Sequence, residues 1–414
     1  MIRNLKNLGH LGLAFLAVLF YRFPARHLIV IGVTGTSGKT TTTHLIYEIL
    51  KKADKKVSMI SSISAIINQK SFDTGFHVTT PSSFALQKFI RKAVNGGSEY
   101  LVLETSSHAL DQHRIFGVPF NIGVITNLVH EHLDYHKTLS AYRDAKSKLI
   151  SRAKYSVLNK DDAIFSFLKQ KAGGKSFTFA IDNQADYTLK NITIKPKIPG
   201  KFNLYNILAA YATGKILKIN EKIINRAISE FRGIPGRMEE IKTNKPFKVI
   251  IDFAHKPDAL EQALKTSRTI AKNKLITIFG CAGLRDRLKR PMMGEIAGKF
   301  ADYTILTAED PRTEDVRNII NEIAHGCTRS GAIEKNKRDK SRNSLRDGKK
   351  YFWRIADRQE AINFAIRKLA QAGDLILVCG KGHEQSMCYG KIEYPWDEKK
   401  AITKALYGTV KIAS

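Results

Sequence analysis

Residues 28–43 read LIVIGVTGTSGKTTTT, and this stretch decides the fold of the first half of the chain. An apolar, β-branched run leads into a glycine-rich turn, and a helical pattern of apolar residues follows. In a strand–turn–helix unit of this kind, backbone N–H groups can surround phosphate oxygens in front of the positive helix end. We expect Lys39 to reach the terminal phosphates of a nucleotide and Thr40 to hold Mg²⁺, with the loop completed by Gly35, Thr36, Ser37, Gly38 and Thr41. A turn without a ligand is the plainer alternative, and Lys-Thr at the helix start disfavours it.

The rest of the chain alternates short β-rich runs with helical stretches, which is typical of α/β proteins with mostly parallel sheets. The clearest runs are 28–33, 100–104, 122–126, 249–253, 275–279, 303–307 and 375–379. We predict an N-terminal hydrophobic helix over 1–27, a central P-loop ATPase domain over 28–235 and a C-terminal Rossmann-like α/β domain over 236–414. The segment Gly233-Ile234-Pro235-Gly236 would link the last two. Ligands of such folds bind at the C-terminal ends of the strands.

The composition indicates an anionic ligand in a reducing compartment. The 414 residues carry 68 Lys+Arg against 38 Asp+Glu, a formal charge of +30. This excess favours nucleotides, nucleic acid or anionic lipid as partners, although a solvated basic surface would also account for it. Because no nucleic-acid-binding module is recognisable, we expect no specific nucleic-acid partner. The four cysteines form no C-x-x-C pair, which disfavours structural zinc and a disulfide framework and favours the cytosol.

Two segments carry unusual patterns. An unbroken apolar run of eleven residues, 11–21, has basic residues on both sides, and a membrane-spanning helix needs about 20 apolar residues. The run could pack on the protein, lie in the membrane interface or form a tilted anchor, and we favour an interfacial helix at the inner face of the membrane. Residues 335–350 hold eight basic and two acidic residues and no aromatic ones, which predicts a mobile, solvated surface loop.

Two further side chains follow predicted strands. Glu104 ends the run YLVLE, and His132 lies in NLVHEHLDYH, a few residues after the run IGVIT. Each could be an ordinary turn residue. Their presence beside a phosphate loop in one α/β domain favours ligands for a hard cation next to the nucleotide.

Ordered motifs along the chain resemble the Mur ligase family, and most closely its members that add the third residue of the peptidoglycan stem peptide. These motifs are TTP at 79–81, ETSSHALDQHR at 104–114, HLDYH at 132–136, AYRDAK at 141–146, FNLYN at 202–206, PGRMEE at 235–240, DFAHKPDAL at 252–260, GLRDRLKRP at 283–291, EDPRTED at 309–315 and GKGHE at 380–384. The resemblance covers nearly everything after residue 28.

The resemblance implies a role for each matching residue. The catalytic group would be Lys39, Lys146, His132 and Arg114, and Mg²⁺ would be held by Thr40, Glu104, His132 and a carbamylated Lys146. ATP would further contact Asn203, Asn206, Arg237, Asp252 and His255. The muramyl-dipeptide acceptor would meet Thr79, Thr80, Ser106, Gln112 and Arg114. The incoming amino acid would meet Arg285, Asp310, Arg312, Gly380 and Glu384.

The chemistry implied is amide-bond formation through an acyl phosphate, with ATP and Mg²⁺ as cofactors. ATP activates the acceptor carboxylate, and an amine then displaces phosphate while the C-terminal domain closes. Family members that add diaminopimelate carry Asp-Asn-Pro-Arg, whose arginine meets the far carboxylate. This chain has Glu309-Asp310-Pro311-Arg312, and the retained arginine favours meso-diaminopimelate over lysine. We expect a cytoplasmic monomer acting on small molecules.

The chain departs from the family at its N-terminus. Full-length members carry a UDP-binding domain of about one hundred residues there, and we expect it to be missing here. The acceptor could therefore be nucleotide-linked, held by the other two domains or by a partner, or it could be lipid-linked. Further alternatives are a lipid II amidating subunit, which would carry a cysteine cluster for zinc, a folylpolyglutamate synthetase, and a non-catalytic nucleotide-binding scaffold.

Overall fold

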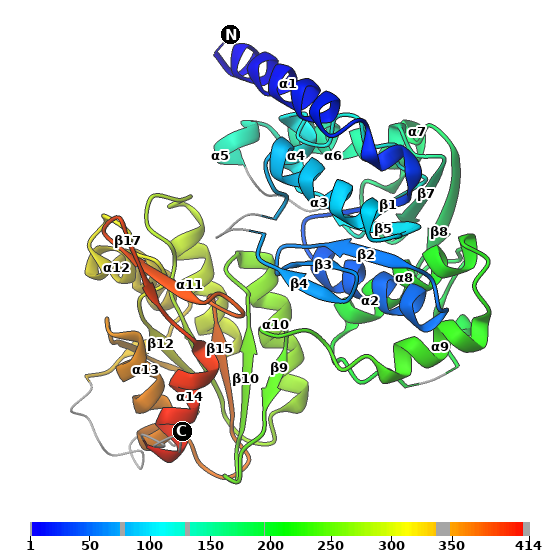
Figure 1. Cartoon of the computed structure of the whole chain (residues 1–414). Helices are drawn as coiled ribbons and strands as arrows, with labels where there is room; N and C mark the ends of the chain where they lie inside the picture. The colour runs from blue at the N-terminus through cyan, green and yellow to red at the C-terminus, as the bar shows by residue number, and fades with distance from the viewer. Residues whose placement is uncertain (1, 75–78, 129–132, 194, 337–347, 409–414) are drawn as a thin grey trace, which may run out of the picture. The chain divides into compact units, whose positions relative to one another are not determined.

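The structure is a computed structural model that describes residues 2–74, 79–128, 133–193, 195–336 and 348–408 (Figure 1). The chain divides into two compact units, Met1–Arg232 and Gly233–Ser414, called unit 1 and unit 2 below.

Unit 1 is built on a mostly parallel sheet. Within the described residues the sheet has eight strands, in the spatial order β4 (Lys70–Phe72), β3 (Ala65–Ile67), β2 (Val57–Ile60), β5 (Tyr100–Glu104), β1 (Ile29–Thr34), β6 (Ile122–Ile125), β7 (Tyr155–Asn159) and β8 (Lys175–Phe179). The pairings from β2 to β8 are parallel, and β3 and β4 form an antiparallel edge. The central strands are buried on both faces, which explains why their sequences are continuous apolar runs.

Helices cover both faces of this sheet (Figure 1). They are α1 (Ile2–Phe20), η1 (Pro24–His27), α2 (Lys39–Lys52), α3 (Ser83–Asn95), α4 (Ser107–Asp111), α5 (Leu133–His136), α6 (Leu139–Ser151), α7 (Phe165–Lys171), η2 (Leu189–Asn191), α8 (Lys201–Ile216) and α9 (Glu221–Glu230). Helix α2 packs against α8 and α9, while α3 packs against α1 and η1. Gly214 of α8 allows this helix to approach α9 closely, because a Cβ at Gly214 would lie 2.9 Å from the Ile224 side chain.

Unit 2 is a second α/β layer structure. Its sheet has, among the described residues, the order β13 (Ile333–Glu334), β14 (Tyr351–Arg354), β12 (Tyr303–Leu306), β11 (Leu275–Phe279), β15 (Leu375–Cys379), β10 (Lys248–Asp252) and β9 (Glu239–Ile241). Only the pairing of β9 with β10 is antiparallel in this sheet. The helices are α10 (Pro257–Ile270), α11 (Lys289–Phe300), α12 (Val316–Arg329), α13 (Arg358–Phe364), η4 (Ala365–Leu369) and α14 (Glu398–Tyr407), and β16 (Ser386–Tyr389) pairs with β17 (Ile392–Pro395) as a separate hairpin.

The predicted fold class is confirmed in both units. The strands expected at 100–104, 275–279 and 375–379 have those bounds, and the other four expected strands differ by one residue at one or both ends. The helix predicted over 1–27 is shorter than expected, because α1 ends at Phe20 and Pro24–His27 form the separate short helix η1. Across the described residues, no helix combines the length and the apolar character needed to cross a bilayer. The basic segment predicted to be a mobile loop lies largely outside the described residues, since 337–347 are not among them.

Candidate active site

The phosphate loop of unit 1 joins the end of β1 to the start of α2. Gly38 precedes the helix in the left-handed conformation, with φ of 78°. A Cβ at Gly38 would lie 2.1 Å from Oδ1 of Asn206, so glycine is required both by the conformation and by the neighbour. Asn206 in turn donates a 3.1 Å hydrogen bond from Nδ2 to Oδ1 of Asn203. Of the two asparagines expected to contact ATP, Asn206 therefore lies directly against the loop and Asn203 lies behind it.

Lys39 is folded back over the loop that it follows. Its Nζ donates to the carbonyl oxygens of Gly35, at 3.1 Å, and Thr36, at 2.9 Å. Asn127, which follows β6, supports the other side of the loop, since its Oδ1 accepts from the backbone N–H of Ser37 at 2.9 Å. The α2 N-terminus and an ammonium group thus sit at one place, which is the arrangement that binds phosphate. Thr41 is buried in the first turn of the same helix.

Glu104 lies at the hydroxyl group of Thr40. The parallel register pairs Val33 of β1 with Glu104 of β5, which brings the strand-end carboxylate to the loop. Thr40 Oγ1 donates to Glu104 Oε1 at 3.0 Å, and the backbone N–H of Ser62 donates to Oε2 at 2.9 Å. Ser62 Oγ also lies 3.1 Å from Thr40 Oγ1. Glu104 is 1% exposed, and its carboxylate with the hydroxyl oxygens of Thr40 and Ser62 forms a set of oxygen ligands that fits a hard divalent cation beside a phosphate.

Lys146 reaches the same loop from α6. Its side chain is 1% exposed, and Nζ donates to the carbonyl oxygen of Gly35 at 2.5 Å and to Thr34 Oγ1 at 3.4 Å. Gly35 therefore accepts from two lysines, Lys39 and Lys146. Two like charges at one buried carbonyl oppose each other, so any modification that removes the charge of Lys146 would relieve this repulsion.

His132, predicted to be a metal ligand, lies outside the described residues, so the structure does not place it. Among the residues that are described, no three His, Cys, Asp or Glu side chains gather in a way that could hold a metal ion. Of the expected metal ligands, Thr40, Glu104 and Lys146 lie around one loop.

The residues predicted to hold the acceptor form a connected group in unit 1. The hydroxyl of Thr80 donates to the carbonyl oxygen of Glu104 at 3.1 Å and accepts from the backbone N–H of Ser106 at 3.0 Å. Arg114 donates from Nε to Oε1 of Gln112 at 2.9 Å and from a terminal nitrogen to the carbonyl oxygen of Thr80 at 3.1 Å. Thr79 precedes this group and is half-buried. Desolvation lowers the pKa of Arg114 from its ordinary value.

Three of the residues predicted to contact ATP belong to unit 2, and two of them lie against the ring of Phe253. The guanidinium of Arg237 stacks over the Phe253 ring, 4.3 Å from its centre, and the His255 ring lies 4.5 Å from the same centre. Asp252 accepts from the backbone N–H groups of Met238 and Ala254, each at 2.8 Å. Desolvation raises the pKa of Asp252, against the opposing charge of Arg237.

The loops that carry the predicted amino-acid pocket are joined to each other in unit 2. The backbone N–H of Gly283 donates to the Asp310 carbonyl oxygen at 2.9 Å, and the Arg312 guanidinium donates to the Gly283 carbonyl oxygen at 3.1 Å. Asp310 and Arg312 both adopt positive φ, 43° and 54°. Non-glycine residues in this region cost about 1–3 kcal/mol and concentrate at ligand sites.

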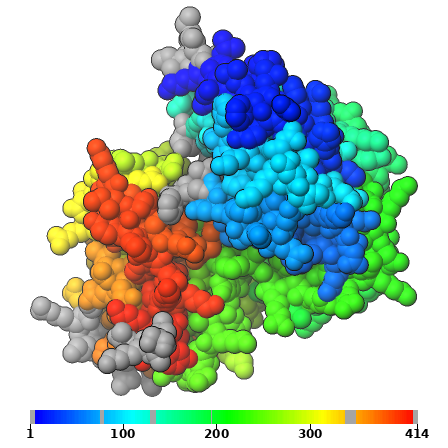
Figure 2. All heavy atoms as spheres, viewed as in Figure 1, coloured from blue at the N-terminus to red at the C-terminus, as the bar shows by residue number. Residues whose placement is uncertain are grey.

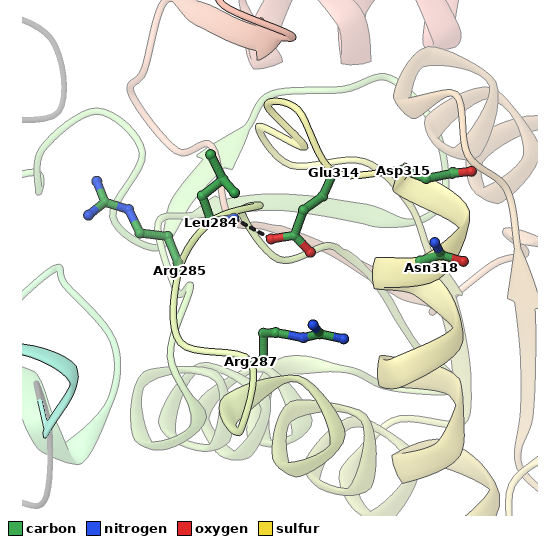
Figure 3. A pocket seen from close by; sticks show the side chains of 6 residues that line it. All are labelled: Leu284, Arg285, Arg287, Glu314, Asp315 and Asn318. Atoms are coloured by element: carbon green, nitrogen blue, oxygen red, sulfur yellow. Dashed lines mark hydrogen bonds between the residues drawn. The ribbon is translucent and has the colours of Figure 1, made fainter.

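Arg285 is one of the residues that line an open pocket of about 500 Å³ (Figure 3). The figure shows its guanidinium pointing away from Glu314, whose carboxylate accepts from the Leu284 backbone N–H. The pocket is lined by Leu284, Arg285, Arg287, Glu314, Asp315 and Asn318.

Lys381 connects Asp310 and Glu384, and only its position in the motif GKGHE pointed to it. Its buried Nζ donates to Asp310 Oδ1 at 2.8 Å and lies 2.7 Å from Glu384 Oε2. Burial opposes the charge of Lys381, but the carboxylates of Glu384 and Asp310 raise its pKa. Asp310 is therefore an ion-paired carboxylate, which explains how an aspartate is tolerated in this motif.

The sequence did not predict three residues that support the site, because each acts through a partner distant in the chain. These residues are Ser62, Asn127 and Lys381.

Glu309 is the second unexpected feature of this pocket. Its Oε2 is buried with no hydrogen-bond partner among the residues that the structure describes, and it faces Gly380, where a Cβ would lie 2.7 Å from that oxygen. Gly380 has φ of 108°, a backbone conformation that favours glycine. Burial raises the pKa of Glu309 to about 8, against the attraction of Lys289, Lys381 and Arg358.

We expect the stability of unit 2 to fall as the pH rises because of Glu309. Its folded pKa of about 8 exceeds the ordinary 4.5, so the folded state keeps a proton that the unfolded chain releases. The contribution is therefore fully present below about pH 4.5, declines by up to about 1.4 kcal/mol per pH unit, and is lost above about pH 8. Urea unfolding followed by tryptophan fluorescence isolates unit 2, since both tryptophans, Trp353 and Trp396, lie in it.

The Glu309→Gln variant should show a flatter dependence of unfolding free energy on pH between 5 and 8 than the wild type. Glu295→Gln, at an exposed carboxylate of α11, is the matched control and should keep the wild-type slope. Equal slopes for wild type and Glu309→Gln would contradict the assignment.

Taken together, unit 1 has the architecture of a nucleotide-dependent enzyme with a phosphate loop and an oxygen-rich cation position. Comparison with family models matches residues 33–214 to the Mur ligase middle domain and residues 236–382 to the Mur ligase glutamate ligase domain. The chain belongs to the Mur ligase family, which consists of ATP-dependent amide ligases.

The most informative relatives share one activity. The chain is 37% identical over 423 residues to the UDP-N-acetylmuramoyl-L-alanyl-D-glutamate–2,6-diaminopimelate ligase of Bacillus cereus, covering 96% of this chain and 82% of the relative. It is equally 37% identical, over 426 residues, to the ligase of the same name from Geobacter metallireducens. A solved structure of a ligase with this name is 31% identical with a TM-score of 0.59, covering 92% of this chain and 78% of that one. The FolC protein of E. coli has a TM-score of 0.66 at 16% identity, which shows a shared fold.

Proposed function

We propose that this protein joins meso-diaminopimelate to a UDP-MurNAc-L-Ala-D-Glu acceptor through an acyl-phosphate intermediate, as a step of peptidoglycan precursor synthesis. The observation that carries the proposal is the 3.0 Å hydrogen bond between Thr40 and Glu104, beside Lys39 on the phosphate loop. A nucleotide site of this kind in a chain 37% identical to diaminopimelate-adding ligases supports the reaction class and the substrates together.

The residues of unit 1 suit the first chemical step. An oxygen of the acceptor carboxylate attacks the γ-phosphorus of ATP, the bond to the bridging oxygen of ADP breaks, and an acyl phosphate forms. Lys39 and the α2 N-terminus offset negative charge on the phosphates, and Arg114 does so at the acceptor side. The amine of the incoming amino acid then attacks the acyl carbon, phosphate leaves, and the amine loses a proton.

Mg²⁺ would be held by Thr40 and Glu104, with His132 and a carbamylated Lys146 as further ligands, and it would supply charge neutralisation of the transferring phosphoryl group. Carbamylation converts the Lys146 cation to an anion. This change would replace the repulsion between Lys39 and Lys146 at the Gly35 carbonyl with attraction.

The amino acid would be bound by Arg285, Asp310, Arg312, Gly380 and Glu384 of unit 2. Diaminopimelate has a second carboxylate that lysine lacks, and Arg312 is the residue suited to pair with it. Arg237, Asp252 and His255 would meet the nucleotide. We propose a monomer that works in the cytoplasm, where ATP is available, with its first helix at the inner face of the membrane.

Release of ADP, measured with purified protein, tests the proposal. The acceptor is offered as a UDP-linked, a lipid-linked or a free muramyl dipeptide, and each is combined with meso-diaminopimelate or lysine. The expected result is ADP release that requires both the UDP-linked acceptor and diaminopimelate. Preference for the lipid-linked acceptor would show that the substrate is a lipid-linked muramyl peptide. No ADP release with any pair of acceptor and amine would reject ligase activity.

A further inference from the structure

Helix α1 of unit 1 has one face packed on the protein and one face turned outward. The packed face is formed by Ala14, Ala17 and Val18, which are at most 1% exposed. Val18 fits against the backbone of Gly117, where a Cβ would lie 2.7 Å from it. The side chain of Arg91 on α3 donates to the carbonyl oxygen of Tyr21, just after the helix. The helix is therefore held in one orientation by the rest of unit 1.

The outward face of α1 is apolar along its described length. Phe84, at the start of α3, extends this surface, since its ring lies 6.4 Å from that of Phe20. Figure 2 shows dark blue atoms of the first residues on the surface, next to lighter blue and cyan atoms of later residues of unit 1. We call the following residues, between 40% and 72% exposed, the apolar face: Leu8, Leu13, Phe15, Leu16, Leu19, Phe20 and Phe84. Large exposed apolar patches of this kind mark interaction sites.

The charged side chains of residues 1–27 and of helix α3 are all basic. Residues 1–27 and helix α3 contain no aspartate or glutamate. Exposed basic side chains lie on the same segments, and Lys88 follows Phe84 by one turn on the same side of α3. We call the following residues the basic rim: Lys6, Arg22, Arg26, Lys88 and Lys92.

From this combination we infer that the apolar face and the basic rim bind the surface of an anionic lipid membrane, with α1 lying in the interface. Apolar side chains enter the headgroup boundary while lysine and arginine pair with lipid phosphates. A second copy of this chain is a poorer occupant, because two copies would bring two basic rims together, and neither residues 1–27 nor α3 contain an acidic residue to pair with them. The interfacial orientation also agrees with the length and composition of α1, which do not suffice to cross a bilayer.

Membrane binding would bring the acceptor side of the enzyme to the bilayer. Asn7 of α1 donates to Asp111 Oδ2 at 3.1 Å, and Tyr135 donates to the same oxygen at 3.0 Å. Gln112, next to Asp111, belongs to the group proposed to hold the acceptor. This functional consequence rests on the proposed function, whereas the lipid-binding surface itself does not.

Sedimentation of the full chain with lipid vesicles tests the inference. We expect binding to vesicles that contain phosphatidylglycerol, little binding to vesicles of phosphatidylcholine alone, and weaker binding at high salt. Leu13→Ser combined with Leu16→Ser removes two exposed apolar side chains and should weaken binding by at least about tenfold. Lys88→Glu should weaken binding to anionic vesicles alone. Leu189→Ser combined with Ile333→Ser, at exposed apolar sites elsewhere, is the matched control and should bind as the wild type does.

Two results would overturn the inference. One is equal binding by the wild type and the Leu13/Leu16 double variant. The other is a dimer in light scattering that the double variant converts to a monomer, because the apolar face would then be covered by a second copy. ADP release on a soluble acceptor is measured in parallel, and it should be unchanged in the double variant. If the wild type released no ADP, the proposed function would be contradicted, whereas the conclusion from vesicle binding would be unaffected.

Discussion

Replacing Lys146 by alanine should lower kcat for ADP release by at least about a thousandfold, while ATP still binds. Lys146 is 1% exposed and its Nζ lies on the phosphate loop, where its charge or its carbamate acts at short range. A charged group in a buried site commonly contributes several kcal/mol to the transition state, and about 4 kcal/mol corresponds to a thousandfold in rate. The measurement is steady-state ADP release, with nucleotide affinity followed separately by fluorescence of a labelled ATP analogue.

Two further variants distinguish a carbamate from a bare ammonium group. Lys146→Arg keeps a positive charge that cannot be carbamylated, so it should be as inactive as the alanine variant. A small carboxylate such as acetate should restore part of the activity to Lys146→Ala, because it can supply the missing anion. Lys169→Ala, at an exposed lysine of α7, should behave as the wild type. If Lys146→Arg retained most of the activity, the carbamate would be excluded.

Much of the fold could be predicted because its signals are local. The run 28–33 followed by the glycine-rich turn predicts β1, the phosphate loop and α2, and these form with a one-residue shift in the strand. Central strands such as 100–104 are continuous apolar runs, which a parallel sheet buried on both faces requires. The short antiparallel strands β3 and β4 and the hairpin β16–β17 have no comparable pattern, because three or four residues give too little periodicity to detect.

The sequence predicts the motifs of the site more fully than it predicts the contacts between their side chains. The position of Glu104 next to the loop follows from strand order, since β5 pairs directly with β1. Sequence gives no such order, so the partners Ser62 and Asn127 could not be found from it. The same holds for the ion pair of Asp310 with Lys381, whose residues lie 71 positions apart. The resemblance to a family identified the candidate site residues. Their neighbours became known only from the structure, which brings together loops that are distant in the chain.

Arg312→Ala should lower kcat/KM for meso-diaminopimelate by about a hundredfold or more, with a much smaller effect on lysine. Arg312 is positioned by its own backbone, which has φ of 54° and donates to the Cys388 carbonyl oxygen at 3.0 Å, while its guanidinium donates to Gly283. A charge-assisted hydrogen bond to a carboxylate contributes about 1.5–3 kcal/mol, and loss of a bidentate pair exceeds this. Because lysine has no second carboxylate, it loses nothing when the arginine is removed. The ratio of kcat/KM for the two amines, from ADP release, therefore measures the specificity directly.

Arg317→Ala, at an exposed arginine of α12, is the control for this prediction and should keep the wild-type ratio. An equal loss for both amines in Arg312→Ala would show that the arginine supports the loop and does not select the substrate.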